Sequence, residues 1–241
     1  MKKNILVTGA SRGLGLAITS RLLDDGYYVI ACARNCTPEL TELIAGNEGS
    51  VIYKFLDHNE VDSFSSFVST IAKEVGPLWG LVNNAAVGHD GILPTQHESQ
   101  IEELIRVNIQ APILLAKYAS RSMLVRGGGR IVNISSIIAS TGYKGLAVYG
   151  ATKAAMIGFT RSLARDLGAG KVTVNAVSPG YMETDMTSGL EGEKLASIKR
   201  RSPLGKLADT SDVAASVAFL LGDDAKAITG TVITVDAGST A

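Results

Sequence analysis

The stretch Thr8-Gly9-Ala10-Ser11-Arg12-Gly13-Leu14-Gly15 decides the fold of this chain of 241 residues. A strand-like run from Lys3 to Val7 precedes it, and a helical pattern of apolar residues from Ala17 to Leu23 follows it. A glycine-rich turn between a strand and a helix is the context that a phosphate-binding turn requires, because a helix N-terminus attracts anions. The alternative is a tight strand-to-helix connection that binds nothing. The serine inside the turn and the elements around it favour phosphate binding.

Beyond this turn, strand-like and helix-like runs alternate. The continuous apolar run Tyr28–Ala33 is typical of a buried parallel strand. Further strands are predicted at 51–56, 79–82, 130–136, 172–178 and 232–235, and helices at 38–45, 61–75, 101–125, 148–167 and 212–221. This alternation predicts a doubly wound parallel α/β sheet of about seven strands, with helices on both faces. We expect residues 1–241 to form one domain, because no linker or repeat separates a second one.

The pattern weakens between Tyr181 and Lys206, where glycine, proline and polar residues interrupt it. Open parallel sheets bind ligands outside the carboxyl ends of their strands, and this segment follows such an end. We therefore expect a mobile lid over the site at 181–206.

Composition limits the classes of function. The chain is 46% hydrophobic and 19% charged, as expected of a folded domain with a buried sheet. Its formal net charge is +0, so bulk charge favours neither a nucleic acid nor a membrane surface as a partner. No apolar run approaches the ~18 residues of a membrane span. Cys32 and Cys36 form no disulfide framework, and the histidines show no metal-ligand spacing with them, so we expect a cytoplasmic protein without a metal.

Tyr149 and Lys153 are the strongest candidates for chemistry. Among the seven tyrosines, Tyr149 alone has a lysine four positions later. In a helix these side chains lie on one face, one turn apart. An ammonium group beside a phenol lowers the phenol pKa from its reference of ~10, so such a tyrosine can transfer a proton near neutral pH. For the pair taken alone, a surface tyrosine beside a solvated lysine is the alternative.

Asn108 lies inside the predicted helix 101–125, four residues before Pro112. Proline has no backbone N–H, so the Asn108 carbonyl group loses its helical donor. A free carbonyl beside an asparagine side chain is a place to hold an ordered water. The alternative is a kinked helix with a satisfied polar residue.

Two arginines indicate which nucleotide the turn would bind. The second predicted strand ends at Arg34, where an acidic residue would accept a hydrogen bond from the ribose of NAD. An arginine suits instead the 2′-phosphate of NADP, and Arg12 in the turn could reach the same phosphate. The alternative is a pair of ordinary surface arginines.

Polar residues after other strands are further candidates. Asp57 and His58 follow the strand 51–56, where they either contact an adenine edge or cap the next helix. Asn84 follows the strand 79–82, and it either contacts a cofactor or ties two strands together. Ser136 ends the strand 130–136, at the edge where parallel sheets bind ligands.

Together these residues resemble the short-chain dehydrogenase/reductase family from Thr8 to Gly238, which is nearly the whole chain. The matching motifs are Thr8-Gly9-x-x-x-Gly13-x-Gly15, Asn83-Asn84-Ala85-Ala86, Asn108, Ser136, Tyr149-x-x-x-Lys153 and Pro179-Gly180. Ser136 lies thirteen residues before Tyr149, the spacing typical of the family, and this selects it over Ser135. Glycine is commoner at the place of Ala86. The resemblance implies a Rossmann-type fold.

The resemblance also implies a role for each matched residue. Tyr149 would be the general acid in the reduction of a carbonyl, and Lys153 would lower its pKa and bind the nicotinamide ribose. Ser136 would hold the substrate oxygen, and Asn108 would hold the water of a proton relay. Contacts to an NADP cofactor are expected from Gly9, Ser11, Arg12, Gly13, Leu14, Gly15, Arg34, Asp57, His58, Asn84, Ala85, Ala86, Tyr149, Lys153, Pro179, Gly180, Met182 and Thr184.

Within the family, the stretches 180–186, 228–230 and 235–238 are most similar to 3-oxoacyl-(acyl carrier protein) reductases. Those enzymes use NADPH and are usually homotetramers. The resemblance therefore implies NADPH-dependent reduction of a β-ketoacyl thioester in fatty acid or polyketide-type synthesis. The alternatives are a short-chain dehydrogenase acting on a small ketone, alcohol, sugar or coenzyme A thioester, and a catalytically silent cofactor-binding scaffold.

An acyl carrier protein as partner predicts a basic surface near the site entrance, because carrier helices are acidic. The candidates are Arg126, Arg130, Lys171 and the run Lys199-Arg200-Arg201. For each of them an ordinary solvated charge is the alternative. A homotetramer is expected to bury the small-residue helix 148–167 with the helix before it, and the segment 213–235.

Overall fold

The computed structural model describes residues 3–182 and 192–241, and in these residues seven parallel strands form one sheet. The strands lie in the order β3-β2-β1-β4-β5-β6-β7. Their bounds are β1 Asn4–Thr8, β2 Tyr28–Ala33, β3 Val51–Phe55, β4 Leu78–Asn83, β5 Gly129–Ile134, β6 Val172–Pro179 and β7 Val232–Val235. The predicted doubly wound fold is confirmed, and each strand lies within a few residues of its predicted place.

Alternating side chains of the strands build two cores, one on each face of the sheet. Every residue of β1 is buried. Ile5 and Val7 pack in one core with Ile18 of the first helix, whereas Leu6 packs in the other core with Phe64. Because successive residues of a strand point to opposite faces, a strand that is covered on both sides must be apolar throughout.

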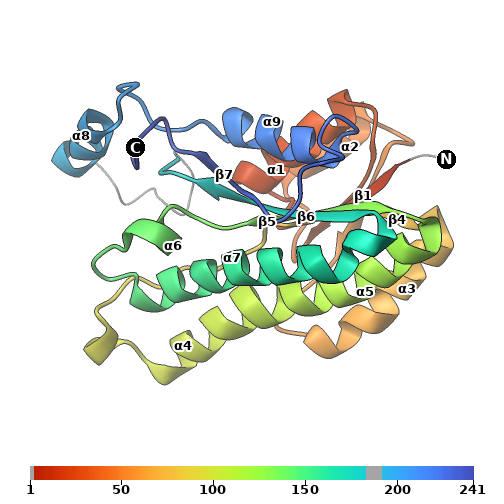
Figure 1. Cartoon of the computed structure of the whole chain (residues 1–241), viewed down its shortest axis with the longest axis horizontal. Coiled ribbons are helices and arrows are strands. Elements are labelled where there is room, and N and C mark those ends of the chain that lie inside the picture. The colour runs from red at the N-terminus through yellow and green to blue at the C-terminus, as the bar shows by residue number, and fades with distance from the viewer. Residues whose placement is uncertain (1–2, 183–191) are drawn as a thin grey trace.

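Helices cover both faces of the sheet (Figure 1). One face carries α1 (Gly13–Asp24), α2 (Pro38–Gly46) and α9 (Thr210–Leu221). The other carries α3 (Phe64–Val75), α4 (Glu98–Ile105), α5 (Ala111–Arg126) and α7 (Ala147–Leu167). Shorter helical segments are η1 (Val61–Ser63), η2 (Leu93–Thr95), α6 (Ile138–Thr141) and η4 (Gly168–Gly170).

A π-helical turn divides the long helix that was predicted at 101–125. The turn, η3 (Arg106–Gln110), joins α4 to α5, and the Ala111 N–H donates to the Arg106 carbonyl, five residues back. The widened turn precedes Pro112, which has no N–H to continue the α-helical pattern. Asn108 lies in the middle of this turn, and π turns of this kind occur frequently at functional sites.

The segment predicted as a lid, 181–206, contains a helix, α8 (Gly192–Arg201). Ile198 of this helix is buried. The segment after α8 is tied to the end of the chain, because the Ser202 hydroxyl donates to the Ala237 carbonyl at 2.6 Å. Residues 183–191, including Thr184, lie outside the described residues. Motion of this segment stays a prediction.

None of the helices in residues 3–182 and 192–241 is long and apolar enough to cross a membrane. In the same residues, no three side chains of His, Cys, Asp or Glu gather closely enough to hold a metal ion. Both cysteines are free thiols, with Cys32 in the core and Cys36 at the surface.

Candidate active site

The residues predicted to be catalytic meet at the edge of the sheet where the strands end. Ser136 lies two residues after β5, and Tyr149 and Lys153 lie in the first half of α7. Asn108 lies in η3, which packs against α7. The short helix α6, which follows Ser136, also packs against α7. The fold thus gathers side chains that are far apart in the sequence.

Lys153 is held by the end of β5. The residue is 5% exposed, and its ammonium group donates a hydrogen bond of 3.0 Å to the Ile134 carbonyl. The same ammonium group lies 5.6 Å from the centre of the Tyr149 ring. The Ser135 hydroxyl donates to the Lys153 carbonyl at 2.9 Å, which fixes this turn of α7. Burial lowers the pKa of Lys153 to about 8.

Tyr149 is hydrogen-bonded to the Ser136 side chain, and burial raises its pKa to about 12 against the opposing effect of that bond. The sequence predicted the opposite direction from the charge of Lys153, and for this structure that prediction is wrong. The reason is that burial disfavours the phenolate by more than the hydrogen bond from Ser136 favours it. Tyr149 is therefore a protonated phenol at neutral pH, which is the form that a proton donor needs.

The Asn108 side chain holds η3 to its neighbours. Its amide oxygen accepts from the Val87 N–H at 2.9 Å, and its amide nitrogen donates to the Val87 carbonyl at 2.9 Å and to Thr152 Oγ1 at 3.2 Å. Thr152 in turn donates to the Tyr149 carbonyl at 2.7 Å. The side chain thus positions the turn of α7 that carries Tyr149. This leaves the main-chain carbonyl of Asn108 as the candidate for holding a relay water.

A chain of buried polar side chains runs from β4 through β5 to α7. Asn83 donates to Asn133 at 2.8 Å and to the Pro112 carbonyl at 3.3 Å, and Asn133 donates to Thr160 at 2.9 Å. Thr160 lies two helical turns after Lys153, so this series of hydrogen bonds couples the start of α5 to the catalytic helix. These hydrogen bonds were not predicted from the sequence. The available signal was an asparagine in each of two apolar strands, because a buried amide needs a partner.

The glycine-rich turn after β1 fits a pyrophosphate. Arg12, the N-cap residue of α1, makes no side-chain cap hydrogen bond, and the first turn of α1 holds no acidic residue. The amide groups at this helix end are therefore available to an anion. Gly9 and Gly13 have φ values of 65° and 52°, which favour glycine. A Cβ atom on Gly15 would lie 1.9 Å from the Gly9 carbonyl oxygen, so this glycine lets α1 pack against the turn.

Thr8 and Asn84 join β1 to β4, at the point where the strand order reverses. The Thr8 hydroxyl oxygen accepts from the N–H groups of Asn84 and Ala85, both at 3.0 Å. The Asn84 amide nitrogen donates to the Thr8 carbonyl at 2.9 Å. Of the two roles left open for Asn84, the structure shows the tie between strands. Ala85 and Ala86 follow it with half-buried side chains along the crevice where such sheets bind ligands.

Arg34 lies directly after β2, and its side chain is exposed. The loop that carries it is joined to the glycine-rich turn, because Thr37 Oγ1 donates to the Ser11 carbonyl at 2.6 Å. The structure thus brings Arg34 and Arg12 onto two connected loops. Leu14, in contrast, is buried in the core, so only its backbone can face a phosphate.

Asp57 and His58 have local structural roles. The Asp57 carboxylate accepts from the Asn59 N–H at 2.9 Å, which is the pattern of an aspartate that opens a turn. His58 packs edge-on against Phe64 with ring centres 5.8 Å apart, and burial lowers its pKa to about 4. The predicted capping role is not seen, because Glu60 is the N-cap residue of η1 and Ser63 is that of α3. Contact of this pair with an adenine edge stays a prediction.

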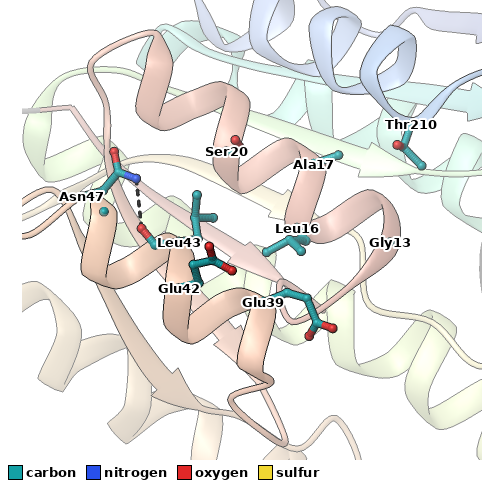
Figure 2. Close-up of a pocket in the computed structure, with 10 residues that line it drawn as sticks. Gly13, Leu16, Ala17, Ser20, Glu39, Glu42, Leu43, Asn47 and Thr210 are labelled. Atoms are coloured by element: carbon teal, nitrogen blue, oxygen red, sulfur yellow. Dashed lines mark hydrogen bonds between the residues drawn. The ribbon is translucent and has the colours of Figure 1, made fainter.

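An open groove of about 680 Å³ lies between α1 and α2 (Figure 2). Its lining includes Gly13 and Leu16 from the start of α1 and the carboxylates of Glu39 and Glu42 from α2. No residue of the predicted catalytic set lines this groove. Because two glutamates repel anions, the groove is unsuited to a pyrophosphate, which the end of α1 suits better.

Pro179 ends β6 and Gly180 follows it, beside the catalytic loop. The Ile137 N–H donates to the Pro179 carbonyl at 3.0 Å, and the Gly180 N–H donates to the Val235 carbonyl at 2.9 Å. A Cβ atom on Gly180 would lie 2.7 Å from the Asp236 Cβ, so glycine lets this segment pass the end of β7. Met182, two residues after Gly180, packs against the core on the α1 side, and its place beside the nicotinamide stays a prediction.

Comparison with known proteins agrees with this geometry. A family model described as enoyl-(acyl carrier protein) reductase matches residues 9–240. The 3-oxoacyl-(acyl carrier protein) reductase of Haemophilus influenzae is 37% identical over 98% of this chain and 97% of its own length. The chain belongs to the short-chain dehydrogenase/reductase family.

Two solved members of the short-chain dehydrogenase/reductase family show how widely the fold is used. A short-chain dehydrogenase from Burkholderia cenocepacia, in complex with NADP, is 35% identical with a TM-score of 0.92 and covers 99% of this chain and 98% of that chain. A gluconate 5-dehydrogenase from the same organism, in complex with NADP and tartrate, is 25% identical with a TM-score of 0.95. The match covers 100% of this chain and 96% of that chain. Membership makes this chain an oxidoreductase, but the fold alone does not select its substrate.

The basic residues correct one expectation. Arg126, Arg130 and Lys171 lie where β5 and β6 begin, at the opposite edge of the sheet from Ser136. Arg130 is also 5% exposed and stacks 4.7 Å from the centre of the Trp79 ring. These side chains are therefore remote from the site entrance of their own chain. Figure 1 shows α8 at the same end of the molecule as α6, and the last turn of α8 carries Lys199, Arg200 and Arg201.

Proposed function

We propose that this oxidoreductase reduces β-ketoacyl thioesters with NADPH, converting a 3-oxoacyl group on an acyl carrier protein to the 3-hydroxyacyl group. The observation that carries the proposal is the 37% identity, over 98% of the chain, to the 3-oxoacyl-(acyl carrier protein) reductase of Haemophilus influenzae. The site supports it, because a serine, a protonated tyrosine and a buried lysine lie together at the ligand-binding edge of the sheet.

The reaction requires a hydride for the ketone carbon and a proton for its oxygen. NADPH along the glycine-rich turn would supply the hydride. Ser136 would hold the ketone oxygen, and Tyr149 would donate its proton to that oxygen as negative charge develops there. Lys153 would stabilise the resulting phenolate, because its ammonium group lies 5.6 Å from the ring centre.

The choice of NADP over NAD rests on the loops that carry Arg12 and Arg34. Both loops adjoin the start of α1, and the bond of 2.6 Å between Thr37 and the Ser11 carbonyl joins them. An arginine forms charge-assisted hydrogen bonds with a phosphate, each worth roughly 1.5–3 kcal/mol. Solved relatives with bound NADP support the same choice.

A second candidate is the oxidation or reduction of a small alcohol, sugar, ketone or coenzyme A thioester. The observation that favours it is the TM-score of 0.95 to a gluconate 5-dehydrogenase. A silent cofactor-binding scaffold is disfavoured, because Asn108, Ser136, Tyr149 and Lys153 are all present and gathered at one edge.

The proposed partner is an acyl carrier protein, docked on the basic last turn of α8, and the proposed assembly is a cytoplasmic homotetramer. Arg200 and Arg201 are exposed there. Charge complementarity to an acidic carrier raises the association rate. Leu124 and Val125 of α5 are 45% and 87% exposed, which is consistent with a face covered by another copy.

The test measures NADPH oxidation with acetoacetyl groups on acyl carrier protein, on coenzyme A and on N-acetylcysteamine, and with 5-oxogluconate. We expect the highest kcat/KM on the carrier, with a preference that shrinks as salt rises, because exposed charges are screened over ~8–10 Å. Arg200→Glu should weaken the carrier reaction, whereas Lys73→Glu, at an exposed residue of α3, should not. Turnover of 5-oxogluconate without turnover of the thioesters would replace this proposal with the second candidate.

A further inference from the structure

The hydroxyl group of Thr152 stands between two parts of the candidate active site, the π turn η3 and the turn of α7 that carries Tyr149. It accepts a hydrogen bond from the Asn108 amide nitrogen at 3.2 Å and donates one to the Tyr149 carbonyl at 2.7 Å. Thr152 also directly precedes Lys153 in the chain. One hydroxyl group is therefore bonded to two of the predicted catalytic residues and belongs to the neighbour of a third.

The direction of each of these hydrogen bonds is determined. A hydroxyl group has a single hydrogen and a carbonyl group can only accept, so the Thr152 hydrogen points to Tyr149 and the oxygen lone pairs are left for Asn108. The Asn108 amide oxygen accepts from the Val87 N–H at 2.9 Å, and its amide nitrogen donates one hydrogen to the Val87 carbonyl at 2.9 Å. Thr152 takes the second amide hydrogen.

Burial separates this hydroxyl group from any ligand. Thr152 is 1% exposed and Asn108 is 2% exposed. The Thr152 side chain therefore cannot touch a substrate or a nucleotide, and whatever it contributes must act through Asn108 and α7. A buried donor that loses its acceptor pays the full cost of its removal from water, so the contact between η3 and α7 depends on this hydroxyl group.

We propose that Thr152 is a positioning residue for the proton relay, because its hydroxyl group sets how closely η3 approaches the turn of α7 that carries Tyr149 and Lys153. The inference rests on the proposed function, in which Tyr149 gives its proton to the substrate oxygen. The resulting phenolate must regain a proton from solvent water before the next turnover. The candidate path uses a water on the Asn108 main-chain carbonyl and the ammonium group of Lys153, which lie on the two segments that Thr152 joins.

The helix α7 offers a matched control two helical turns further along. Thr160 accepts from the Asn133 amide nitrogen at 2.9 Å and donates to the Met156 carbonyl at 2.7 Å, so it makes the same two kinds of hydrogen bond as Thr152. Thr160 is 0% exposed. Neither of its partners belongs to the predicted catalytic set. Loss of either hydroxyl group should therefore cost similar stability, but only one loss should affect the relay.

The test replaces the hydroxyl group by a methyl group in Thr152→Val. With NADPH and the acetoacetyl thioester of N-acetylcysteamine, kcat should fall by about 2- to 13-fold, the change that matches one net hydrogen bond. KM for the thioester and the dissociation constant of NADPH should stay near the wild-type values. The solvent isotope effect on kcat in heavy water should rise, and the primary isotope effect with deuterated NADPH should fall, because the return of the proton becomes the slower step.

Two further variants and a measurement without substrate complete the test. Thr152→Ser keeps a hydroxyl group and should restore kcat and both isotope effects. Thr160→Val should lower the melting temperature about as much as Thr152→Val but leave kcat and both isotope effects near the wild-type values. In hydrogen–deuterium exchange followed by mass spectrometry, the peptide around Val87 should exchange faster in Thr152→Val but not in Thr160→Val, because Asn108 loses one of its partners.

Four results would each overturn the assignment. They are equal losses of kcat in the two valine variants, a raised KM in place of the lowered kcat, an unchanged solvent isotope effect in Thr152→Val, and unchanged exchange around Val87. A wild-type enzyme that leaves the acetoacetyl thioester unreduced would overturn the proposed function instead. The exchange comparison needs no substrate, and the kinetic comparison would then use the carbonyl compound that the wild type does reduce, so the two failures are distinguishable.

Discussion

At the scale of single residues, burial shifts the pKa values of Tyr149 and Lys153 in opposite directions. Burial raises the pKa of Tyr149 to about 12 and lowers the pKa of Lys153 to about 8. At neutral pH the phenol therefore keeps its proton while the lysine keeps its charge. Proton transfer then depends on negative charge that develops on the substrate oxygen, and not on a phenolate formed beforehand.

Tyr149→Phe tests the proton donor. The variant keeps the ring and the lysine but loses the hydroxyl, so turnover should fall by ~10²–10⁴-fold, the contribution of a general acid. NADPH binding, measured by fluorescence titration, should persist. Tyr118→Phe on α5 is the matched control and should leave turnover unchanged. A Tyr149→Phe enzyme with more than about a tenth of wild-type turnover, under conditions where chemistry limits the rate, would contradict the assignment.

His58 links stability to pH. Its folded-state pKa of about 4 lies below the ordinary 6.5, so above pH 6.5 the imidazole is neutral in both states. As pH falls from 6.5 towards 4, the unfolded chain takes up a proton that the folded chain refuses, and stability is lost. Between pH 7.5 and pH 5 the free energy of unfolding should drop by about 2 kcal/mol through this group.

Urea unfolding at the two pH values measures this loss. His58→Asn should be less stable than wild type at pH 7.5, because the packing against Phe64 changes, but its stability should depend less on pH. His97→Asn, at an exposed histidine, should retain the full wild-type pH dependence. An unchanged pH dependence in His58→Asn would show that the imidazole becomes charged in the folded state without penalty.

At the scale of elements, Gly15 controls how closely α1 approaches the turn after β1. In Gly15→Ala, the new methyl group would overlap the Gly9 carbonyl oxygen, so the helix end must shift. Overpacking of this kind costs ~1–3 kcal/mol. We expect lower stability in urea and weaker NADPH binding. Gly46→Ala, at a glycine of α2 with nothing within 4 Å, should change neither by much. Equal stability and equal NADPH binding in the two variants would show that the turn accommodates a methyl group at Gly15 without a shift of the helix.

Local patterns explain which elements could be predicted. The glycine spacing after β1 and the four-residue spacing of Tyr149 and Lys153 are properties of one turn or one helix, so the sequence alone predicts them. The π turn at Asn108, the buried His58 and the raised pKa of Tyr149 depend on what packs around each residue. The position of Arg126, in contrast, could have been predicted correctly, because a residue that precedes a parallel strand lies at the amino end of the sheet, opposite the end that binds ligands.

At the scale of the whole molecule, α7 presents small exposed side chains at Ala151, Ala154, Ala155 and Gly158. Apart from the backbone of its own helix, nothing in the described residues lies within 4 Å of the place where a Gly158 Cβ would be. In a monomer, Gly158→Ala should therefore add ~0.5–1 kcal/mol of stability, as alanine does inside a helix. In the proposed homotetramer, another copy would pack on this face and the methyl group would disturb it.

We expect Gly158→Ala to weaken the tetramer, measured by light scattering across a dilution series. Gly168→Ala, in η4 after the same helix and with equally open surroundings, is the matched control and should leave assembly intact. A Gly158→Ala chain that stays tetrameric and melts at a higher temperature than wild type would place the subunit interface elsewhere.

The bond from Gly180 to Val235 makes β7 the support for the segment after β6, and this has a consequence for synthesis on the ribosome. All the residues from Asn108 to Lys153 leave the ribosome well before β7 does. A nascent chain could therefore close its nucleotide turn and place its proton donor while the segment after β6 still lacks its backing strand. That segment reaches its folded position last, when β7 joins the sheet, so the finished site depends on the final strand of the chain.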